Sequence, residues 1–335
     1  MSTAFPGDPA SSVEADHRLS LTQIELAATL IDRPFLQSPQ SECAALSARL
    51  GCELILKDET ANPIGCFKGR GAEFFAAQFL ARGERAPLVC ASAGNFGLGL
   101  AHACSRRGLE LTVFVAETAN PVKVEGIRRY GAHIISAGRD FDAAKQAARL
   151  HAHVRGLRFV EDGAEPEISE GAGSIAIELL AGGDYDAILV PLGNGALLAG
   201  MARWVKAHSP ATEMIGVCSA GAPVMVECWR HGVGAATIAE AKADTIADGI
   251  AVRVPVPAAV NDLRTLVDDM LLVDDAQLIV AMRLLHSDAG LMCEPSAAAG
   301  VAAIAAHRER FAARRVATVL TGRNLTQTQI EAWFH

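Results

Sequence analysis

The chain has 335 residues, of which 50% are hydrophobic and 20% are charged, as is typical of a packed globular protein and not of a disordered one. One hydrophobic core rarely serves a chain of this length, so two domains are expected. The formal net charge of -8, without any basic block, argues against a nucleic acid or an anionic membrane as partner.

Residues 1–20 are predicted to be a loose tail, because they are polar and lack the positive start and apolar run of a signal peptide. No apolar stretch reaches membrane-spanning length before Gly, Asn, Pro or a charge interrupts it, so no transmembrane helix is expected. The 8 cysteines include no C-x-x-C pair and are predicted to be reduced core residues. We therefore expect a cytoplasmic protein.

The first predicted elements are two helices and a strand. Helical apolar spacing covers residues 21–31 and ends at Arg33-Pro34, and a second short helix is predicted over 38–50, with Gly51 as its stop. The run Glu53-Leu54-Ile55-Leu56-Lys57 is typical of a strand.

Lys68 follows this strand and begins a helix predicted over 68–81, between Phe67 and Gly69. In an apolar pocket a lysine amine is freed to attack a carbonyl carbon and form a Schiff base. The alternative is a solvated lysine, which is the usual kind at the start of a helix.

From residue 88 onward, strands and helices alternate with short connections, which predicts an α/β fold with parallel sheets and crossover helices. The predicted strands are 88–91, 111–115, 133–136, 187–190, 214–218, 270–273 and 316–320. The predicted helices are 98–107, 121–130, 141–153, 168–180, 197–207, 274–287 and 296–307. Residues 231–260 hold several Gly and Pro and are predicted to be irregular.

A turn of small residues, Gly193-Asn194-Gly195-Ala196-Leu197, joins a predicted strand to a helix. Backbone N–H groups that point into one cavity at a helix N-terminus bind phosphate. The turn matches neither a G-x-G-x-x-G fingerprint nor a P-loop. The alternative is a tight turn without a ligand.

Two further turns follow predicted strands. The N–H groups of Ser92-Ala93-Gly94-Asn95-Phe96 could hold a carboxylate, and Asn95 could bond a ring hydroxyl; the alternative is an ordinary turn. Thr321-Gly322-Arg323-Asn324 follows the last strand, at the sheet edge where ligands usually bind, and its hydroxyl could face a ring nitrogen. The alternative is a helix N-cap, for which Thr326 is equally suitable.

Glu294-Pro295-Ser296 also begins a predicted helix, and helix capping is its simplest interpretation. No Cys/His/Asp cluster has the spacing of metal ligands, and no Ser-His-Asp or Cys-His arrangement stands out.

In chain order these motifs resemble those of the fold-type II pyridoxal-phosphate enzymes, the tryptophan synthase β-like family. The likeness is greatest to its threonine/serine dehydratases (ammonia-lyases) and serine racemases, and it covers residues 20–330. Six motifs match in order and approximate spacing: residues 65–72, 92–95, 193–200, 248–252, 294–296 and 321–324.

The resemblance implies two lobes, each a mostly parallel twisted sheet covered by helices. A large cofactor-binding domain would comprise residues 1–64 and 156–335, and a small mobile domain, residues 65–155, would close over the substrate. The resemblance also implies pyridoxal 5'-phosphate as the cofactor, a small amino acid as the substrate, and a homodimer.

Site residues carry over from the family by position. Lys68 would be the catalytic residue and would hold the cofactor as a Schiff base. The cofactor would also contact Phe67, Asn95, Gly193, Asn194, Gly195, Ala196, Leu197, Glu294 and Thr321, with the phosphate on 193–197, the ring hydroxyl on Asn95 and the ring nitrogen at Thr321. The substrate carboxylate would lie on Ser92, Ala93, Gly94, Asn95 and Phe96.

The chain also departs from the family pattern. Asn194 and Ala196 stand in a phosphate loop that is often all glycine, although both still supply backbone N–H groups. Phe96 replaces a common His, which makes the substrate pocket more apolar. Cys218 stands where cation-binding relatives have Glu, so no metal is expected there.

The implied activity is β-elimination from a hydroxy amino acid such as threonine or serine, which gives a 2-oxo acid and ammonia. Lys68 would take the Cα proton, and the resemblance suggests that the hydroxyl leaves with a proton delivered through the cofactor phosphate. A neutral hydroxyl at Thr321 makes the ring a weaker electron sink, which favours prompt elimination. Racemases of the family place a serine at the position of Ala93, and alanine cannot transfer a proton.

Several other activities remain open at this point: β-replacement, threonine synthase, diaminopropionate ammonia-lyase and amino-acid racemase. A non-catalytic protein that binds an amino acid or the cofactor is the alternative from a different class. Lys68 argues against that alternative, because simple binding does not require a Schiff-base lysine.

Overall fold

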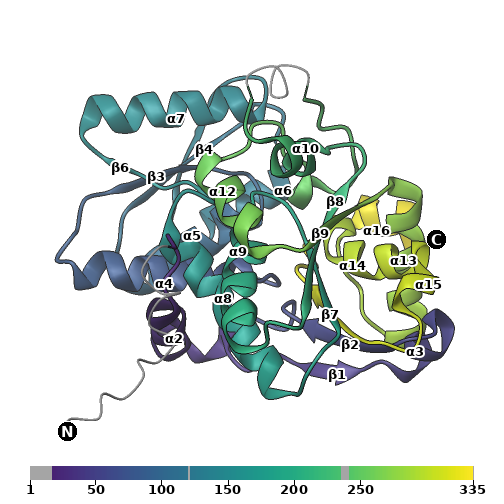
Figure 1. The fold of residues 1–335 in the computed structure, drawn as a ribbon. Helices are drawn as coiled ribbons and strands as arrows, with labels where there is room; N and C mark the ends of the chain where they lie inside the picture. Colours follow the sequence, from purple (N-terminus) through teal and green to yellow (C-terminus); the bar gives the residue numbers. More distant parts are fainter. Residues whose placement is uncertain (1–16, 120, 235–240, 335) are drawn as a thin grey trace, which may run out of the picture.

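The computed structural model describes residues 17–119, 121–234 and 241–334, and these form two lobes, each built on one sheet (Figure 1). The sheet of the large lobe has the strand order β1-β2-β10-β7-β8-β9, and that of the small lobe has the order β5-β4-β3-β6. Each pairing among these strands is parallel, except that of β1 with β2 at the edge. The predicted α/β fold with two mostly parallel sheets is confirmed.

The strands are short, from 2 residues in β6 to 7 in β8. Those of the large lobe are β1 (Gln40–Glu42), β2 (Glu53–Asp58), β7 (Ala187–Pro191), β8 (Glu213–Ser219), β9 (Asp269–Val273) and β10 (Arg315–Leu320). Those of the small lobe are β3 (Leu88–Ala91), β4 (Leu111–Val115), β5 (His133–Ser136) and β6 (Arg158–Phe159).

Helices cover both faces of the large sheet, so its central strands are apolar on both sides. Within β7, Ile188 and Val190 belong to one core cluster, and Ala187 and Leu189 belong to the other. The helices on the first face are α2 (Leu21–Leu30), α8 (Pro166–Ala181), α9 (Ala196–His208), α10 (Val224–His231) and α12 (Pro257–Leu266). The helices on the second face are α3 (Ala44–Leu50), α13 (Asp275–Ala289), α14 (Ala299–Ala306) and α15 (Arg308–Phe311).

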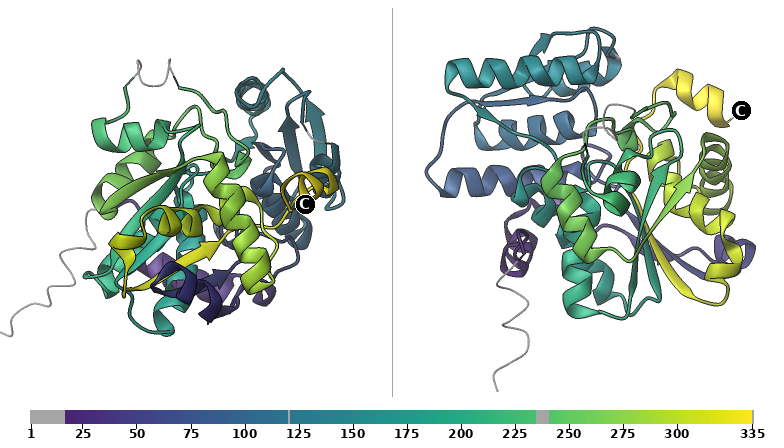
Figure 2. Two further views of the ribbon diagram at one scale, coloured as in Figure 1. Left: turned by 90° about the vertical axis from the view of Figure 1, so that its right-hand side faces the viewer. Right: turned by 45° about the horizontal axis from the view of Figure 1, so that its top comes forward.

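The small lobe is layered in the same way, and Figure 2 shows the two lobes side by side. On one face of its sheet lie α4 (Lys68–Ala81), α5 (Asn95–Arg107) and α6 (Pro121–Arg128), and on the other lies α7 (Phe141–Arg155). The remaining elements are the 3-10 turns η1 (Arg33–Phe35), η2 (Asp248–Ile250) and η3 (Pro295–Ala298), and the helix α16 (Gln327–Phe334).

Two sequence predictions of local structure are wrong. The helix predicted over 38–50 begins only at Ala44, because Gln40–Glu42 forms β1 and pairs antiparallel with β2. A tertiary pairing therefore overrides the helical spacing of that stretch. The region 231–260, predicted to be irregular, contains the start of α12, whose Pro257 occupies the first turn, where its fixed φ suits a helix.

Two further observations concern the chain as a whole. No helix among the described residues is long and apolar enough to cross a membrane. The cysteines are all free thiols, and all but Cys43 are buried, as the sequence predicted.

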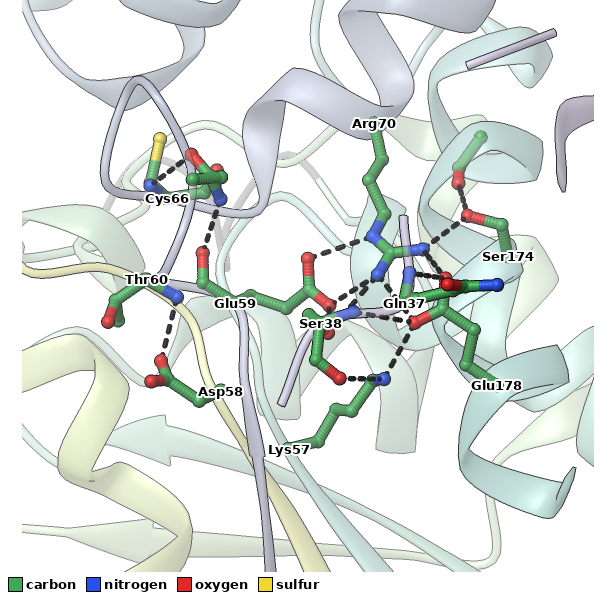
Figure 3. A network of polar contacts seen from close by, with 12 residues as sticks. Gln37, Ser38, Lys57, Asp58, Glu59, Thr60, Cys66, Arg70, Ser174 and Glu178 are labelled. Atoms are coloured by element: carbon green, nitrogen blue, oxygen red, sulfur yellow. Dashed lines mark hydrogen bonds and ion pairs between the residues drawn. The ribbon is translucent and has the colours of Figure 1, made fainter. Parts of the chain in front are cut away.

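A buried network of charged side chains fixes the first turn of α4 (Figure 3). Arg70 is fully buried and donates hydrogen bonds to both carboxylate oxygens of Glu59, at 2.7 and 2.8 Å, and of Glu178, at 2.7 and 2.9 Å. Lys57 donates to Glu178 at 2.7 Å. Two cations therefore face two carboxylates, and the network joins the end of β2 to α4 and α8.

The pKa of Glu178 reflects this balance of charge. Burial alone would raise it, but hydrogen bonds and charges from Arg70 and Lys57 lower the pKa to about 2. Lys68, the first residue of α4, lies two residues before Arg70. The network therefore also holds the start of this helix in place.

Replacing Arg70 with leucine is expected to destabilise the protein strongly, because Glu59 and Glu178 would lose their shared partner while remaining buried. Removing one partner of a buried ion pair costs about 3–5 kcal/mol. The free energy of unfolding, measured by urea titration, should fall by that amount.

Arg82→Leu is the matched control, because Arg82 directly follows the same helix but pairs with Glu84 and Glu167 at an exposed site. Loss of an exposed pair costs about 1 kcal/mol or less. Equal losses in the two variants would contradict the role given to the buried network.

Candidate active site

A cavity of about 940 Å³ brings together residues that lie far apart in the sequence. Its walls come from the start of α4, the turns that follow β3, β7 and β10, and the segment around η2. All the site residues predicted from the sequence line it: Phe67, Lys68, Ser92, Ala93, Gly94, Asn95, Phe96, Gly193, Asn194, Gly195, Ala196, Leu197, Glu294 and Thr321.

Lys68 is the first residue of α4, and its side chain is only 15% exposed. Its Nζ lies 2.5 Å from Oδ2 of Asp162 and 4.6 Å from the centre of the Phe67 ring. The interpretation of Lys68 as a solvated surface lysine is therefore wrong. Its amine faces a cavity, between an aromatic ring and a carboxylate.

The turn Gly193–Leu197 has the geometry of a phosphate cradle. Gly195 has φ +95°, a left-handed conformation that residues with a side chain rarely adopt. A Cβ on Gly193 would lie 2.6 Å from the carbonyl oxygen of Gly249, so only glycine fits there. The turn leads into α9, whose first backbone N–H groups have no partner within the helix and carry partial positive charge.

The turn Ser92–Phe96 begins α5 in the same way. Oγ of Ser92 accepts hydrogen bonds from the backbone N–H groups of Gly94, at 3.2 Å, and Gly97, at 3.0 Å. The hydroxyl thus holds the turn in shape, at the entry to a helix where a carboxylate would be favoured. Phe96, the last residue of this turn, is nearly buried.

Glu294 connects two of these turns from inside the protein. Its Oε1 accepts a hydrogen bond from Nδ2 of Asn95 at 2.6 Å, and its Oε2 accepts one from the backbone N–H of Asn324 at 3.2 Å. Burial, together with the nearby charge of Asp248, raises the pKa of Glu294 to about 7. The side chain makes no capping hydrogen bond to η3, so the capping interpretation of Glu294 is wrong.

Thr321 lies at the end of β10, nearly buried in the cavity wall. Its carbonyl oxygen accepts a hydrogen bond from the backbone N–H of Phe67 at 3.0 Å, which ties the lysine segment to the sheet edge. Thr326 is the residue that caps α16, since its hydroxyl accepts from the N–H of Gln329 at 3.3 Å. The alternative role of Thr321 as a helix cap is therefore excluded.

Two charged residues of the cavity, Asp162 and Lys123, were not predicted from the sequence. Asp162 follows β6, a strand of two residues that the sequence did not reveal. Lys123 of α6 forms an ion pair with Asp248 of η2, which joins the two lobes. Asp248 lies in the motif 248–252, but its partner Lys123 belongs to no motif.

The cavity fits pyridoxal 5'-phosphate, as two observations indicate. The turn at the start of α9 can accept an anion, and Oγ of Ser296 in the cavity wall is buried without a hydrogen-bond partner. Among the described residues, no group of His, Cys, Asp and Glu is arranged to hold a metal ion.

Comparison with known proteins yields one family. The family described as pyridoxal-phosphate dependent enzyme matches residues 31–322. L-threonine ammonia-lyase of Geobacter sulfurreducens is 34% identical over 284 residues, which cover 83% of this chain and 69% of that protein. The chain is thus similar along most of its length to a curated enzyme.

Two solved structures share the fold. The processed form of threonine deaminase isoform 2 from Solanum lycopersicum has a TM-score of 0.86 and 27% identity, and the match covers 97% of this chain and 93% of that one. A pyridoxal 5'-phosphate-dependent aspartate racemase has a TM-score of 0.85 and 27% identity, with 95% and 98% covered.

The raised pKa of Glu294 makes stability depend on pH. Glutamate titrates at 4.5 in the reference state and at about 7 in the folded protein, so its contribution is fully present below pH 4.5 and is lost as the pH rises through 7. Glu294→Gln removes this loss. Relative to the variant, the wild type should lose on the order of 2 kcal/mol of unfolding free energy between pH 5 and pH 8.

Urea titrations of both proteins at the two pH values measure this difference. Any constant cost of the glutamine amide facing Asn324 cancels, because only the change with pH is compared. Parallel pH profiles of the two proteins would contradict the titration of Glu294 in this range.

Proposed function

This chain belongs to the pyridoxal-phosphate dependent enzymes, and on that premise we propose that it is an ammonia-lyase that converts a hydroxy amino acid, threonine or serine, to a 2-oxo acid and ammonia. The observation that carries the proposal is the position of Lys68, whose amine faces a cavity lined by a phosphate cradle and a second anion-binding turn. The 34% identity to an L-threonine ammonia-lyase supports the same activity.

The chain supplies a place for each part of the cofactor, which when bound provides the electron sink for the reaction. Lys68 would hold it covalently, residues 193–197 would hold its phosphate, and Asn95 and Thr321 would contact the ring. During the reaction the amine of Lys68 takes the proton from the substrate Cα, as a general base. Phe67 and Glu294 complete the cavity wall beside these groups.

The substrate carboxylate would lie on the turn Ser92–Phe96, opposite the lysine. Phe96 brings a nearly buried apolar ring to this turn, which favours an uncharged substrate side chain. Ala93 lines the cavity at the turn and has no group that can transfer a proton. A racemase needs a second acid or base at Cα, so the structural likeness to an aspartate racemase does not extend to the chemistry at this position.

We further infer that the small domain, predicted over residues 65–155, closes over the substrate on the large domain, predicted over 1–64 and 156–335. The strand β6 (Arg158–Phe159) pairs with β3, so the small lobe extends beyond the predicted boundary at residue 155. Ion pairs between the lobes support this division: Lys123 with Asp248, and Arg253 with Asp140 and Asp142. They lie among the residues that line the cavity and could hold it closed. A cytoplasmic location and a homodimer remain predictions; the free cysteines support the first.

The activity is tested by adding L-serine, L-threonine and other β-substituted L-amino acids to the purified chain with pyridoxal 5'-phosphate, and measuring 2-oxo acid and ammonia together. We expect both products in equal amounts. Lys68→Ala should abolish them, because the variant lacks both the anchor and the base.

Lys206→Ala is the control for this substitution, since Lys206 pairs with Asp268 outside the cavity. It should retain full activity. A wild-type chain that takes up the cofactor but forms neither product from any of these amino acids would refute the proposed activity.

Ala93→Ser should raise racemisation of L-serine, because it places a hydroxyl proton donor at the turn facing Cα. Chiral chromatography of the unreacted serine measures the D-isomer directly. Unchanged racemisation in a variant that still eliminates would show that the residue at position 93 does not decide between the two reactions.

A further inference from the structure

The carboxylate of Asp162 lies in the cavity, and the proposed function gives it no role. Asp162 lies in the loop between β6 and α8, and its side chain is 9% exposed. Its Oδ2 is 2.5 Å from Nζ of Lys68, and its Oδ1 is buried without a hydrogen-bond partner. A buried carboxylate with an unused oxygen is costly unless a ligand or a proton completes it.

Asn194 holds this carboxylate in place. Its Nδ2 donates to Oδ2 of Asp162 at 3.3 Å, while its backbone forms part of the phosphate cradle. A glycine at position 194 would serve the cradle equally well but could not make this contact. The asparagine therefore orients Asp162, and this accounts for the departure of the loop from an all-glycine sequence.

Asp162 lies beside the turn on which we place the substrate carboxylate. A side hollow of about 60 Å³ is lined by Asp162 together with Ser92, Phe96 and Asn194. Asp162 thus lies between the turn for the substrate carboxylate and the cradle for the phosphate, next to the amine that reaches Cα. Because Cβ is one bond from the Cα that the Lys68 amine would reach, a substituent on Cβ would come near this carboxylate.

We propose that Asp162, in place of the cofactor phosphate that the family resemblance suggested, is the acid that protonates the leaving β-hydroxyl group; this inference rests on the proposed function. The amine of Lys68 takes the proton from Cα and passes it to Oδ2 of Asp162, with which it is already in contact. Asp162 then gives the proton to the β-oxygen as the Cβ–O bond breaks. The oxygen leaves with the bonding electron pair as water, and Lys68 and Asp162 return to their starting charges.

The chemistry of the leaving group gives the test. Hydroxide is a poor leaving group and needs a proton as it departs, whereas chloride leaves as a stable anion. A general acid contributes about 10²- to 10⁴-fold to a rate. Asp162→Asn, which keeps the shape and removes the transferable proton, should lose at least about 10²-fold in kcat/KM for L-serine and little for β-chloro-L-alanine.

Two further measurements complete the experiment on the loaded enzyme. The dissociation constant for pyridoxal 5'-phosphate, from a fluorescence titration, should be unchanged in Asp162→Asn. Asp288→Asn is the matched control, since Asp288 forms an ion pair with Arg49 at 2.7 Å outside the cavity. It should behave as wild type with both substrates.

Other outcomes would overturn the inference. Equal losses with L-serine and β-chloro-L-alanine, or weakened cofactor binding, would mean that Asp162 serves Lys68 or the cradle and not the leaving group. Unchanged activity of Asp162→Asn with L-serine would show that Asp162 has no part in the reaction. If the wild type eliminates neither substrate, the proposed function itself has failed, and the two failures are thus distinguished.

Discussion

The parallel pairing of β10 between β2 and β7 is the constraint on which the site depends. Leu320, the last residue of β10, lies opposite Asp58, the last residue of β2, and Thr318 lies opposite Leu189 of β7. The three strands therefore end at one edge of the sheet. The chain leaves that edge toward Lys68 after β2, toward the phosphate cradle after β7 and toward Thr321 after β10. Parallel register alone brings these segments together, although they are separated by more than a hundred residues in the sequence.

Buried polar groups differ between the network around Arg70 and the cavity. Around Arg70, cations and carboxylates are matched and hydrogen-bonded, as a rigid support requires. Asp162 and Ser296 each have a buried oxygen without a hydrogen-bond partner, as do Glu167 and Ser169 outside the cavity. Because Asp162 and Ser296 line the cavity, a bound ligand can complete their hydrogen bonds.

Periodicity identified the fold class and most strands, and turns of small residues marked the ends of several strands. The wall residues of the cavity were identified by the resemblance of the motifs to a known family. The sequence did not reveal β1, whose strand conformation depends on pairing with β2. Nor did it reveal Asp162, because a single aspartate after a strand of two residues has no pattern around it. Glu294 was predicted both to cap a helix, which its side chain does not do, and to contact the cofactor, and it does line the cavity. The local sequence does not predict which side chains contact one another across the cavity.

Two of the residues that depart from the family pattern lie close to each other in the structure. Phe96 and Asn194 are far apart in the sequence, where nothing connects the two departures. In the structure, both residues line the small hollow beside Asp162. Phe96 makes that wall apolar, and Asn194 orients the carboxylate in it. The side chain of Asn194 thus contacts the carboxylate that pairs with Lys68, while its backbone belongs to the phosphate cradle. These two departures therefore alter the wall of the cavity beside Asp162, where we place the substrate side chain.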